Sequence, residues 1–257
     1  MATTVNVEEL RNRVQDVYRE VAERPSGEFH FEIGRTLAER LGYDPLVLDQ
    51  ITEGVVDSFA GVGCPFLLAA VREGERVLDL GSGSGMDSCV AALLTGPEGR
   101  VTGIDMTDAQ LEKALRATSN AGITNVNYQK GYVESLPIAP DSVDLVISNG
   151  VINLTADKPG VFAEIVRVLR PGGRMSIADI VSERQLTENI VCDASLWAAC
   201  IGGASQQDDY LEAIEGSGMR VATVLDNESY KFLSKSARQA SLDFGVKSVT
   251  ILAEKLK

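Results

Sequence analysis

The sequence predicts an α/β protein whose main part is a doubly wound, Rossmann-like parallel sheet with a helical extension in front of it. From about residue 76 onward, short apolar runs alternate with amphipathic stretches, a pattern typical of strands and helices wound on both faces of one sheet. The first apolar run, 77–80, breaks into alternating glycines at 81–85, which indicates a strand, a tight turn and the start of a helix. The next run, 100–105, ends in an acid, so a ligand site is expected where both strands end.

Composition and charge narrow the classes of function. At 257 residues, with 44% hydrophobic and 24% charged side chains, the chain has the composition of a globular protein with a substantial core. A formal charge of −13 argues against nucleic acid and anionic membranes as partners, because both call for basic patches. No apolar run approaches the roughly 20 residues that span a bilayer, and the N-terminus is too polar for a signal peptide. We therefore expect a cytoplasmic protein with reduced cysteines, none of which forms a C-x-x-C pair typical of structural zinc.

Residues 1–70 are expected to form a helical extension. Apolar positions recur at helical spacing over 5–22, and two further helices are expected over 34–41 and 46–59. The first helix has two compatible interpretations: simple packing on the domain, and a lid over the active site. His30, the single histidine, lies between two phenylalanines, which is more typical of a packed or surface residue than of a catalytic base.

Residues 71–257 are expected to form a nucleotide-binding domain in which strands and helices alternate. The expected strands are 76–80, 100–105, 125–129, 143–148, 174–181 and 220–225, and the expected helices are 87–95, 108–121, 158–168, 209–217 and 234–240. A polar and then small, apolar stretch at about 183–207 departs from this pattern and is interpreted as an insertion at the acceptor site. The terminal run 246–253 alternates as a strand that pairs antiparallel with its neighbour.

The glycine-rich turn indicates the kind of ligand. Glycines at 81, 83 and 85 permit positive φ angles and leave room for a ligand, and the helix that follows offers unpaired N–H groups. The dinucleotide fingerprint G-x-G-x-x-G needs a glycine at position 86, where Met86 stands. The spacing G-x-G-x-G behind Asp79 instead resembles the S-adenosyl-L-methionine loop of class I methyltransferases. Asp105, twenty residues past Gly85, suits a ribose diol.

Four stretches, 78–85, 101–107, 148–154 and 196–204, together resemble one group of these enzymes, the arsenite S-adenosylmethionine methyltransferases. The resemblance runs from about Ser58 to Ala204 and implies the class I methyltransferase fold with S-adenosyl-L-methionine as cofactor. It also implies the cofactor contacts. The methionine part is expected beside Asp79, Gly81, Ser82, Gly83 and Gly85, the ribose at Asp105, adenine at Met106, Val133 and Glu134, and the methionine part or the acceptor at Asn149.

The same resemblance implies a role for cysteines. Cys64, in a loop fifteen residues ahead of Asp79, and Cys200, three residues after the only tryptophan, match two cysteines of the family. A proline follows Cys64 in place of the family's glycine, and Gly150 stands where the family has a third cysteine; Cys192 is the remaining candidate. Trivalent arsenic is a soft centre that prefers thiolate ligands, so Cys64 and Cys200 are the expected catalytic, arsenic-binding residues. No strong general base is required, because the methyl donor is already activated.

Two other functions fit the same sequence. A methyltransferase for a small organic acceptor, such as a secondary metabolite, would have an apolar pocket under the N-terminal helices, with its cysteines apart or buried. A non-catalytic S-adenosylmethionine-binding protein would show no turnover, although the intact loop at 79–85 argues against it. An arsenite-type enzyme requires Cys64 and Cys200 close together above the methyl group. In the two catalytic cases the acceptor is a small molecule, and the sequence leaves the oligomeric state open.

Overall fold

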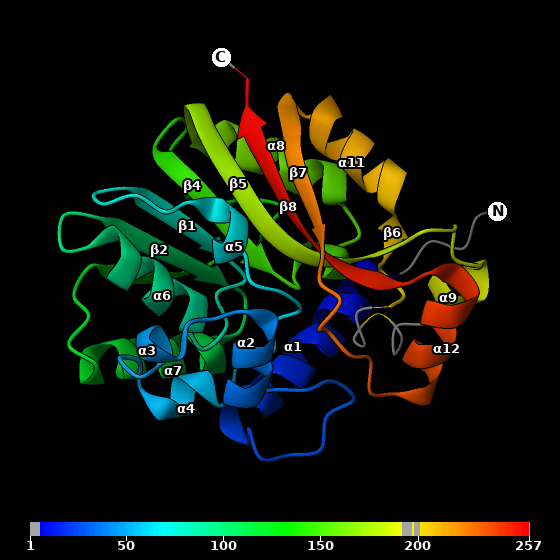
Figure 1. Ribbon diagram of the computed structural model, residues 1–257, viewed down its shortest axis with the longest axis horizontal. Helices are drawn as coiled ribbons and strands as arrows, with labels where there is room; N and C mark the ends of the chain where they lie inside the picture. Colours follow the sequence, from blue (N-terminus) through cyan, green and yellow to red (C-terminus); the bar gives the residue numbers. More distant parts are fainter. Residues whose placement is uncertain (1–5, 192–196, 198–200, 257) are drawn as a thin grey trace.

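A twisted sheet with helices on both faces dominates the computed structural model, which describes residues 6–191, 197 and 201–256 (Figure 1). The strands are β1 (Arg76–Leu80), β2 (Arg100–Asp105), β3 (Val126–Lys130), β4 (Val143–Asn149), β5 (Leu169–Ser182), β6 (Ser205–Gln206), β7 (Met219–Asp226) and β8 (Lys247–Lys255). Their order is β3-β2-β1-β4-β5-β8-β7, with β6 beside β5. β1 to β5 pair in parallel, whereas β8 runs antiparallel to both β5 and β7. The predicted doubly wound sheet with an antiparallel last strand is confirmed.

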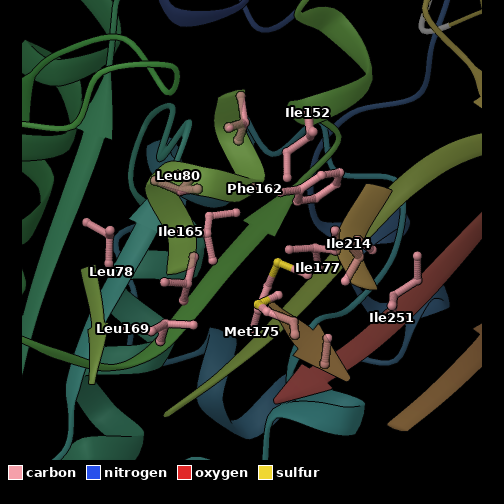
Figure 2. Packing of buried hydrophobic residues seen from close by; sticks show 14 of the residues in the cluster. Leu78, Leu80, Ile152, Phe162, Ile165, Leu169, Met175, Ile177, Ile214 and Ile251 are labelled. Atoms are coloured by element: carbon pink, nitrogen blue, oxygen red, sulfur yellow. The ribbon is translucent and has the colours of Figure 1, made fainter. Parts of the chain in front are cut away.

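The helices of this domain connect the strands. They are α6 (Met86–Thr95), α7 (Asp108–Asn120), η1 (Ile152–Leu154), α8 (Lys158–Val168), α9 (Glu188–Val191), α11 (Gln207–Gly216) and α12 (Lys235–Phe244). Alternate residues of β1 face opposite sides: Val77 packs against alanines of α6, whereas Leu78 and Leu80 pack on the side of α8 and α11. Figure 2 shows the second layer, in which Phe162 and Ile165 of α8 lie over Met175 and Ile177 of β5 and neighbouring strands. Burial on both faces explains why the parallel strands are apolar throughout.

The N-terminal region contributes α1 (Val7–Glu23), α2 (Arg35–Leu41), α3 (Pro45–Leu48), α4 (Glu53–Val56) and α5 (Phe66–Ala69). The side chain of Asn6 caps α1 by accepting from the N–H groups of Glu8 and Glu9. The single helix expected over 46–59 is instead two short helices, α3 and α4. The reason is Thr52, whose extended backbone interrupts the helix and whose hydroxyl donates to the carbonyl of Ala117 on α7.

The order of the strands reverses between β1 and β4, where one crossover leads outward through α6 and the other through α8. Crevices at the carboxyl ends of such strands are where doubly wound sheets bind ligands. In Figure 1 the helices α1 to α4 (blue to light blue) gather at one end of the sheet, whereas α5 (cyan) packs against β5 and β8. Within the described part of the chain, no helix combines the length and apolar character needed to cross a membrane.

Candidate active site

A pocket opens at the carboxyl ends of β1, β2 and β4, and the glycine loop between β1 and α6 forms part of its wall. Gly81, Gly83 and Gly85 have φ angles of +65°, +52° and +90°, conformations that favour glycine. A Cβ on Gly81 would collide with the side chain of Val151, and one on Gly85 would collide with the hydroxyl of Tyr128. Larger residues are therefore excluded from the loop by its neighbours as well as by its backbone.

Asp105 ends β2 with its carboxylate in the pocket wall. Oδ2 accepts a hydrogen bond from the N–H of Gly83 at 2.9 Å, and Oδ1 accepts one from the N–H of Thr107 at 2.8 Å. Burial raises the pKa of Asp105 above its ordinary value of 3.8, and these backbone donors oppose the rise. The carboxylate therefore joins the glycine loop to the end of β2.

Two further carboxylates lie next to the glycine loop and line the same pocket. Asp79, which is 2% exposed, accepts a hydrogen bond from the hydroxyl of Ser88 at 2.6 Å. Asp87, in the first turn of α6, is 7% exposed and accepts from the hydroxyl of Tyr43 at 2.5 Å and from the amide of Asn149 at 3.1 Å. Burial raises the pKa of both carboxyls, that of Asp87 to about 6, and the negative charge of Asp87 adds to the rise at Asp79.

The side chain of Asn149 joins β4 to the loop that precedes α5. Its Oδ1 accepts hydrogen bonds from the N–H groups of Val62 at 2.8 Å and Gly63 at 3.2 Å. Its Nδ2 donates to the carbonyl of Gly63 at 2.9 Å and to the hydroxyl of Tyr43 at 3.0 Å. Asn149 therefore fixes the backbone of the loop that carries Cys64.

Helix α1 covers one side of the pocket, where Arg11, Val14 and Tyr18 line its wall. The guanidinium of Arg11 lies 3.3 Å from a carboxylate oxygen of Glu134, and the amide of Gln110 donates to the carbonyl of Tyr18 at 2.8 Å. These contacts hold the helix against both α7 and the loop after β3.

The wall expected to receive adenine contains Met106, Val133 and Glu134, all of which line the pocket. The amide of Gln15 on α1 donates to the backbone carbonyl of Met106 at 3.2 Å. The carboxylate of Glu134 is already engaged, because it also accepts from the hydroxyl of Thr155 at 2.7 Å. The structure thus brings nine of the ten predicted cofactor residues to the wall of one pocket, whereas Gly85, directly before α6, is not among the residues that line it.

The pocket suits a nucleoside with a charged tail. Its lining combines carboxylates, backbone of the glycine loop and apolar side chains. Ser82 lines it, and its hydroxyl oxygen is buried without a hydrogen-bond partner among the described residues, so a ligand can supply one. Asp105 offers carboxylate oxygens to hydroxyl groups, while Ile104 and Met106 offer apolar surface to a base.

The predicted cysteines are placed differently. The thiol of Cys64 is 2% exposed and lies in an apolar cluster with Leu37, Phe59 and Met86; Cys64 is not among the residues that line the pocket. Burial, and next the negative charge of Asp87, raise the pKa of the Cys64 thiol to about 12. Cys192 and Cys200 lie outside the described residues.

Gly150, at the position where the resemblance places a third cysteine, lines the pocket. Its φ angle is +71°, and its N–H donates to the carbonyl of Ala178 on β5 at 2.8 Å. A Cβ there would lie 3.3 Å from Cγ1 of Val62. The backbone conformation, more than the available space, is therefore what favours glycine at this position.

Known proteins are similar to this chain in sequence and in fold. A family model described as a methyltransferase domain matches residues 72–218. An arsenite methyltransferase from Halobacterium salinarum is 38% identical over 219 residues, which are 85% of this chain and 56% of that protein. The structure of an arsenic (III) S-adenosylmethionine methyltransferase from Chlamydomonas reinhardtii is 32% identical, with a TM-score of 0.65, over 88% of this chain and 75% of that chain. The chain belongs to the arsenic (III) S-adenosylmethionine methyltransferase family.

Membership of this family agrees with the predicted fold, and S-adenosyl-L-methionine is the cofactor that the family name specifies. The chain spans about half the length of the curated arsenite methyltransferases that it matches, from 56% down to 40%. A geranyl diphosphate methyltransferase, solved with its substrate and sinefungin, shares the fold with a TM-score of 0.69 at 21% identity, over 95% of this chain and 99% of that one.

Three residues in and beside this family member's pocket were not expected from its sequence: Asp87 and Arg11 line the pocket, and Tyr43 contacts Asp87. Asp87 had a local signal, since an acid in the first turn after a glycine loop faces the same helix N-terminus as a ligand would. Tyr43 and Arg11 had none, because they meet Asp87 and Glu134 from positions 44 and 123 residues away along the chain.

Proposed function

We propose that this chain is an S-adenosylmethionine-dependent methyltransferase that transfers methyl groups to trivalent arsenic, as arsenite or methylarsenite. The observation that carries the proposal is the 32% identity to an arsenic (III) enzyme over 88% of the chain. This likeness extends well beyond the methyltransferase-domain match at 72–218. It therefore supports a shared acceptor as well as a shared cofactor.

The pocket residues suit this reaction. S-adenosylmethionine supplies a methyl group on a positively charged sulfur, already activated for transfer. The loop Gly81–Gly85 leaves backbone space for the methionine part, and the carboxylate of Asp105 accepts hydrogen bonds from the ribose hydroxyls. Val14 and Tyr18 of α1 line the pocket, which supports the proposal that α1 acts as a lid and excludes water. Because the donor is activated, the protein contributes mainly by holding donor and acceptor in line.

The acceptor side of the proposal rests on the cysteines. Cys64 and Cys200 are the proposed arsenic ligands, with Cys192 as a less supported third. In the described structure the thiol of Cys64 is buried beside Tyr43 and Phe59, so binding arsenic there requires the loop at 61–66 to move. Asn149 controls that movement, because its side chain holds the backbone of Val62 and Gly63.

A small organic acceptor is the second candidate, and one observation favours it. Apolar side chains line the pocket, among them Val14 and Tyr18 of α1, Phe59, Val151 and Leu154, whereas Cys64, which packs in one cluster with Phe59, does not line it. An apolar pocket roofed by the N-terminal helix, with a cysteine buried elsewhere, is what a methyltransferase for an organic molecule would require.

We also propose a cytoplasmic location, since the free thiols of Cys64 and Cys89 suit a reducing compartment. The chain's formal charge of −13 supports a small-molecule acceptor over nucleic acid.

The test is turnover with trivalent arsenicals. Purified protein, S-adenosylmethionine and a thiol reductant are incubated with arsenite or methylarsenite, and methylated arsenic is measured by mass spectrometry. We expect product with the natural chain, loss of product in Cys64→Ser and Cys200→Ser, and product retained in Cys89→Ala, whose thiol is buried in α6 near Thr118. A preference for methylarsenite is expected because Gly150 removes the third thiol. No methylated arsenic, with cofactor binding intact by calorimetry, would contradict the arsenic acceptor and favour an organic one.

A further inference from the structure

Asp87 occupies an unusual position among the acids of the pocket. It lies in the first turn of α6, where the N–H groups of the helix favour a negative charge. Its two oxygens each accept one hydrogen bond, from the Tyr43 hydroxyl and the Asn149 amide, and neither donor carries a charge. The carboxylate is therefore fixed in place and hydrogen-bonded, but it is not neutralised.

The described residues around Asp87 include no compensating cation. The charged or titratable groups that face it are Tyr43 from the loop after α2, Cys64 from the loop before α5, Asp79 from β1 and Cys89 from α6. Among the described residues that line the pocket, the one cationic side chain is Arg11, which is paired with Glu134. A buried carboxylate without a cation is costly, so this end of the pocket is suited to a positively charged ligand.

We propose that Asp87 is the residue by which this chain distinguishes S-adenosylmethionine, whose sulfur is positively charged, from the product S-adenosylhomocysteine, whose sulfur is neutral. The inference rests on the proposed cofactor and adds a specificity-determining residue to the same pocket. The two ligands share the adenosine and the α-amino and carboxyl groups, so they differ at the sulfur in its methyl group and its charge. Transfer of the methyl group removes the charge that Asp87 attracts, and the product is then held less tightly.

The position of Asp87 along the pocket supports this assignment. Met106, Val133 and Glu134 form one wall, and Asp105 stands at the end of β2. Asp87 instead joins Asn149, and through it the loop at 61–63, which lies beside the end of β4. With adenine and ribose at the first wall and Asp105, the remaining sulfur and amino-acid part extends toward Asp87. The raised pKa of Asp87, about 6, agrees with a carboxyl that lacks a cation when the pocket is empty.

The test compares three ligands in two variants. Dissociation constants for S-adenosylmethionine, S-adenosylhomocysteine and sinefungin, which carries an amine at the place of the sulfonium methyl, are measured by calorimetry at pH 7. Asp87→Asn removes the charge and keeps the side-chain size. Tyr43→Phe, compared with the natural chain at pH 8, is the matched control, because it removes a hydrogen bond to Asp87 but keeps the carboxylate charged at that pH, although loss of the hydrogen bond raises its pKa.

We expect Asp87→Asn to lower the preference for S-adenosylmethionine over S-adenosylhomocysteine by about tenfold, as expected for a charge pair a few ångströms apart in a partly screened site. Sinefungin should weaken together with S-adenosylmethionine, whereas Tyr43→Phe should change all three ligands by a similar factor. Equal weakening of all three ligands in Asp87→Asn would overturn the proposal, because Asp87 would then recognise the shared α-amino group or act only on folding.

A second measurement uses the natural chain, so its result does not depend on whether the variant folds. Between pH 7 and pH 5 the α-amino groups of both ligands stay protonated, whereas Asp87 gains a proton. The preference for S-adenosylmethionine should therefore fall with pH, and a constant preference would also overturn the proposal. If the natural chain binds neither ligand, the proposed function fails. Binding with an unchanged preference in Asp87→Asn refutes the role of Asp87 alone.

Discussion

The thiol of Cys64 has two competing descriptions, as an arsenic ligand and as a small apolar side chain. Its neighbours Leu37, Phe59 and Met86 favour packing, and its high pKa reflects burial close to the carboxylate of Asp87. A thiolate would form there only if a bound soft metal ion or a movement of the loop offset the cost of that charge. Stability measurements can separate the two descriptions independently of activity.

Replacing Cys64 by serine should destabilise the chain more than replacing it by alanine. Alanine removes one atom from a packed cluster, which costs about 1 kcal/mol, whereas serine also buries a hydroxyl and costs about 2–3 kcal/mol. Urea denaturation of both variants measures the difference in the free energy of unfolding. Equal stability of the two would show that the serine hydroxyl takes over the hydrogen bonds that the Cys64 sulfur makes with Tyr43 and with the backbone of Phe66 and Leu67.

Helix α1 illustrates how an amphipathic segment becomes part of a binding site. Its apolar residues Leu10 and Val14 pack against Trp197, and its C-terminal end is held by Lys113 of α7. The ammonium of Lys113 donates to the carbonyl of Ala22 at 2.9 Å and to the hydroxyl of Ser58 at 2.5 Å, and burial lowers its pKa. The proposed lid is thus fastened by a charged hydrogen bond at one end and by tryptophan packing nearer the other.

Lys113→Met should loosen the attachment of α1 without changing the residues of the sheet and the glycine loop that line the pocket. Loss of a charged donor to two oxygens is expected to weaken cofactor binding by about threefold to tenfold. The fluorescence of Trp197, the chain's only tryptophan, should shift as its packing against α1 relaxes. Arg116→Met on the same helix is the control, because Arg116 is exposed and paired with Glu112. An unchanged affinity in Lys113→Met would mean that α1 docks independently of this contact.

The elements of the sheet follow from local sequence, whereas the junctions between them do not. Continuous apolar runs that end in Gly81 or Asp105 predict buried parallel strands and a site at their ends. The spacing of apolar residues and the residues that end an element can both be recognised from neighbouring positions in the sequence. The clamp of Asn149 on the backbone of Val62 joins positions 87 residues apart, and no spacing rule reports such a contact. Thr52 ends a helix expected to continue because its hydroxyl finds a partner on α7, which is a tertiary effect.

For the molecule as a whole, buried acids shape the response to pH. Asp179 on β5 accepts from the hydroxyl of Tyr210 at 2.8 Å and from the N–H of Asn153 at 2.9 Å, yet burial raises its pKa from 3.8 to about 6. The folded state therefore holds this proton more tightly than the unfolded state. The stability that the proton confers is complete below about pH 4 and is lost as the pH rises through 6.

Asp179→Asn should remove this dependence. The free energy of unfolding of the variant, relative to that of the natural chain, is expected to increase by about 1–3 kcal/mol between pH 4 and pH 7. Urea denaturation at several pH values measures it. Asp208→Asn, which removes one exposed carboxylate from α11, controls for the change in net charge. A relative stability that stays constant over this range would mean that Asp179 keeps its ordinary acidity.

The left-handed backbone at Gly150 bears on how this lineage could change in future. A cysteine there would add about 1–2 kcal/mol of backbone strain, because an L side chain is disfavoured at a φ of +71°. The peptide is also tied to β5 through Ala178, and Val62 crowds the added Cβ, so relief of the strain would require several neighbours to change first. A mutation that restores the third thiol would therefore meet a cost in folding before it gained a ligand. Recruitment of a thiol at this position is therefore a change in two stages, in which the backbone must be relieved before a ligand is gained.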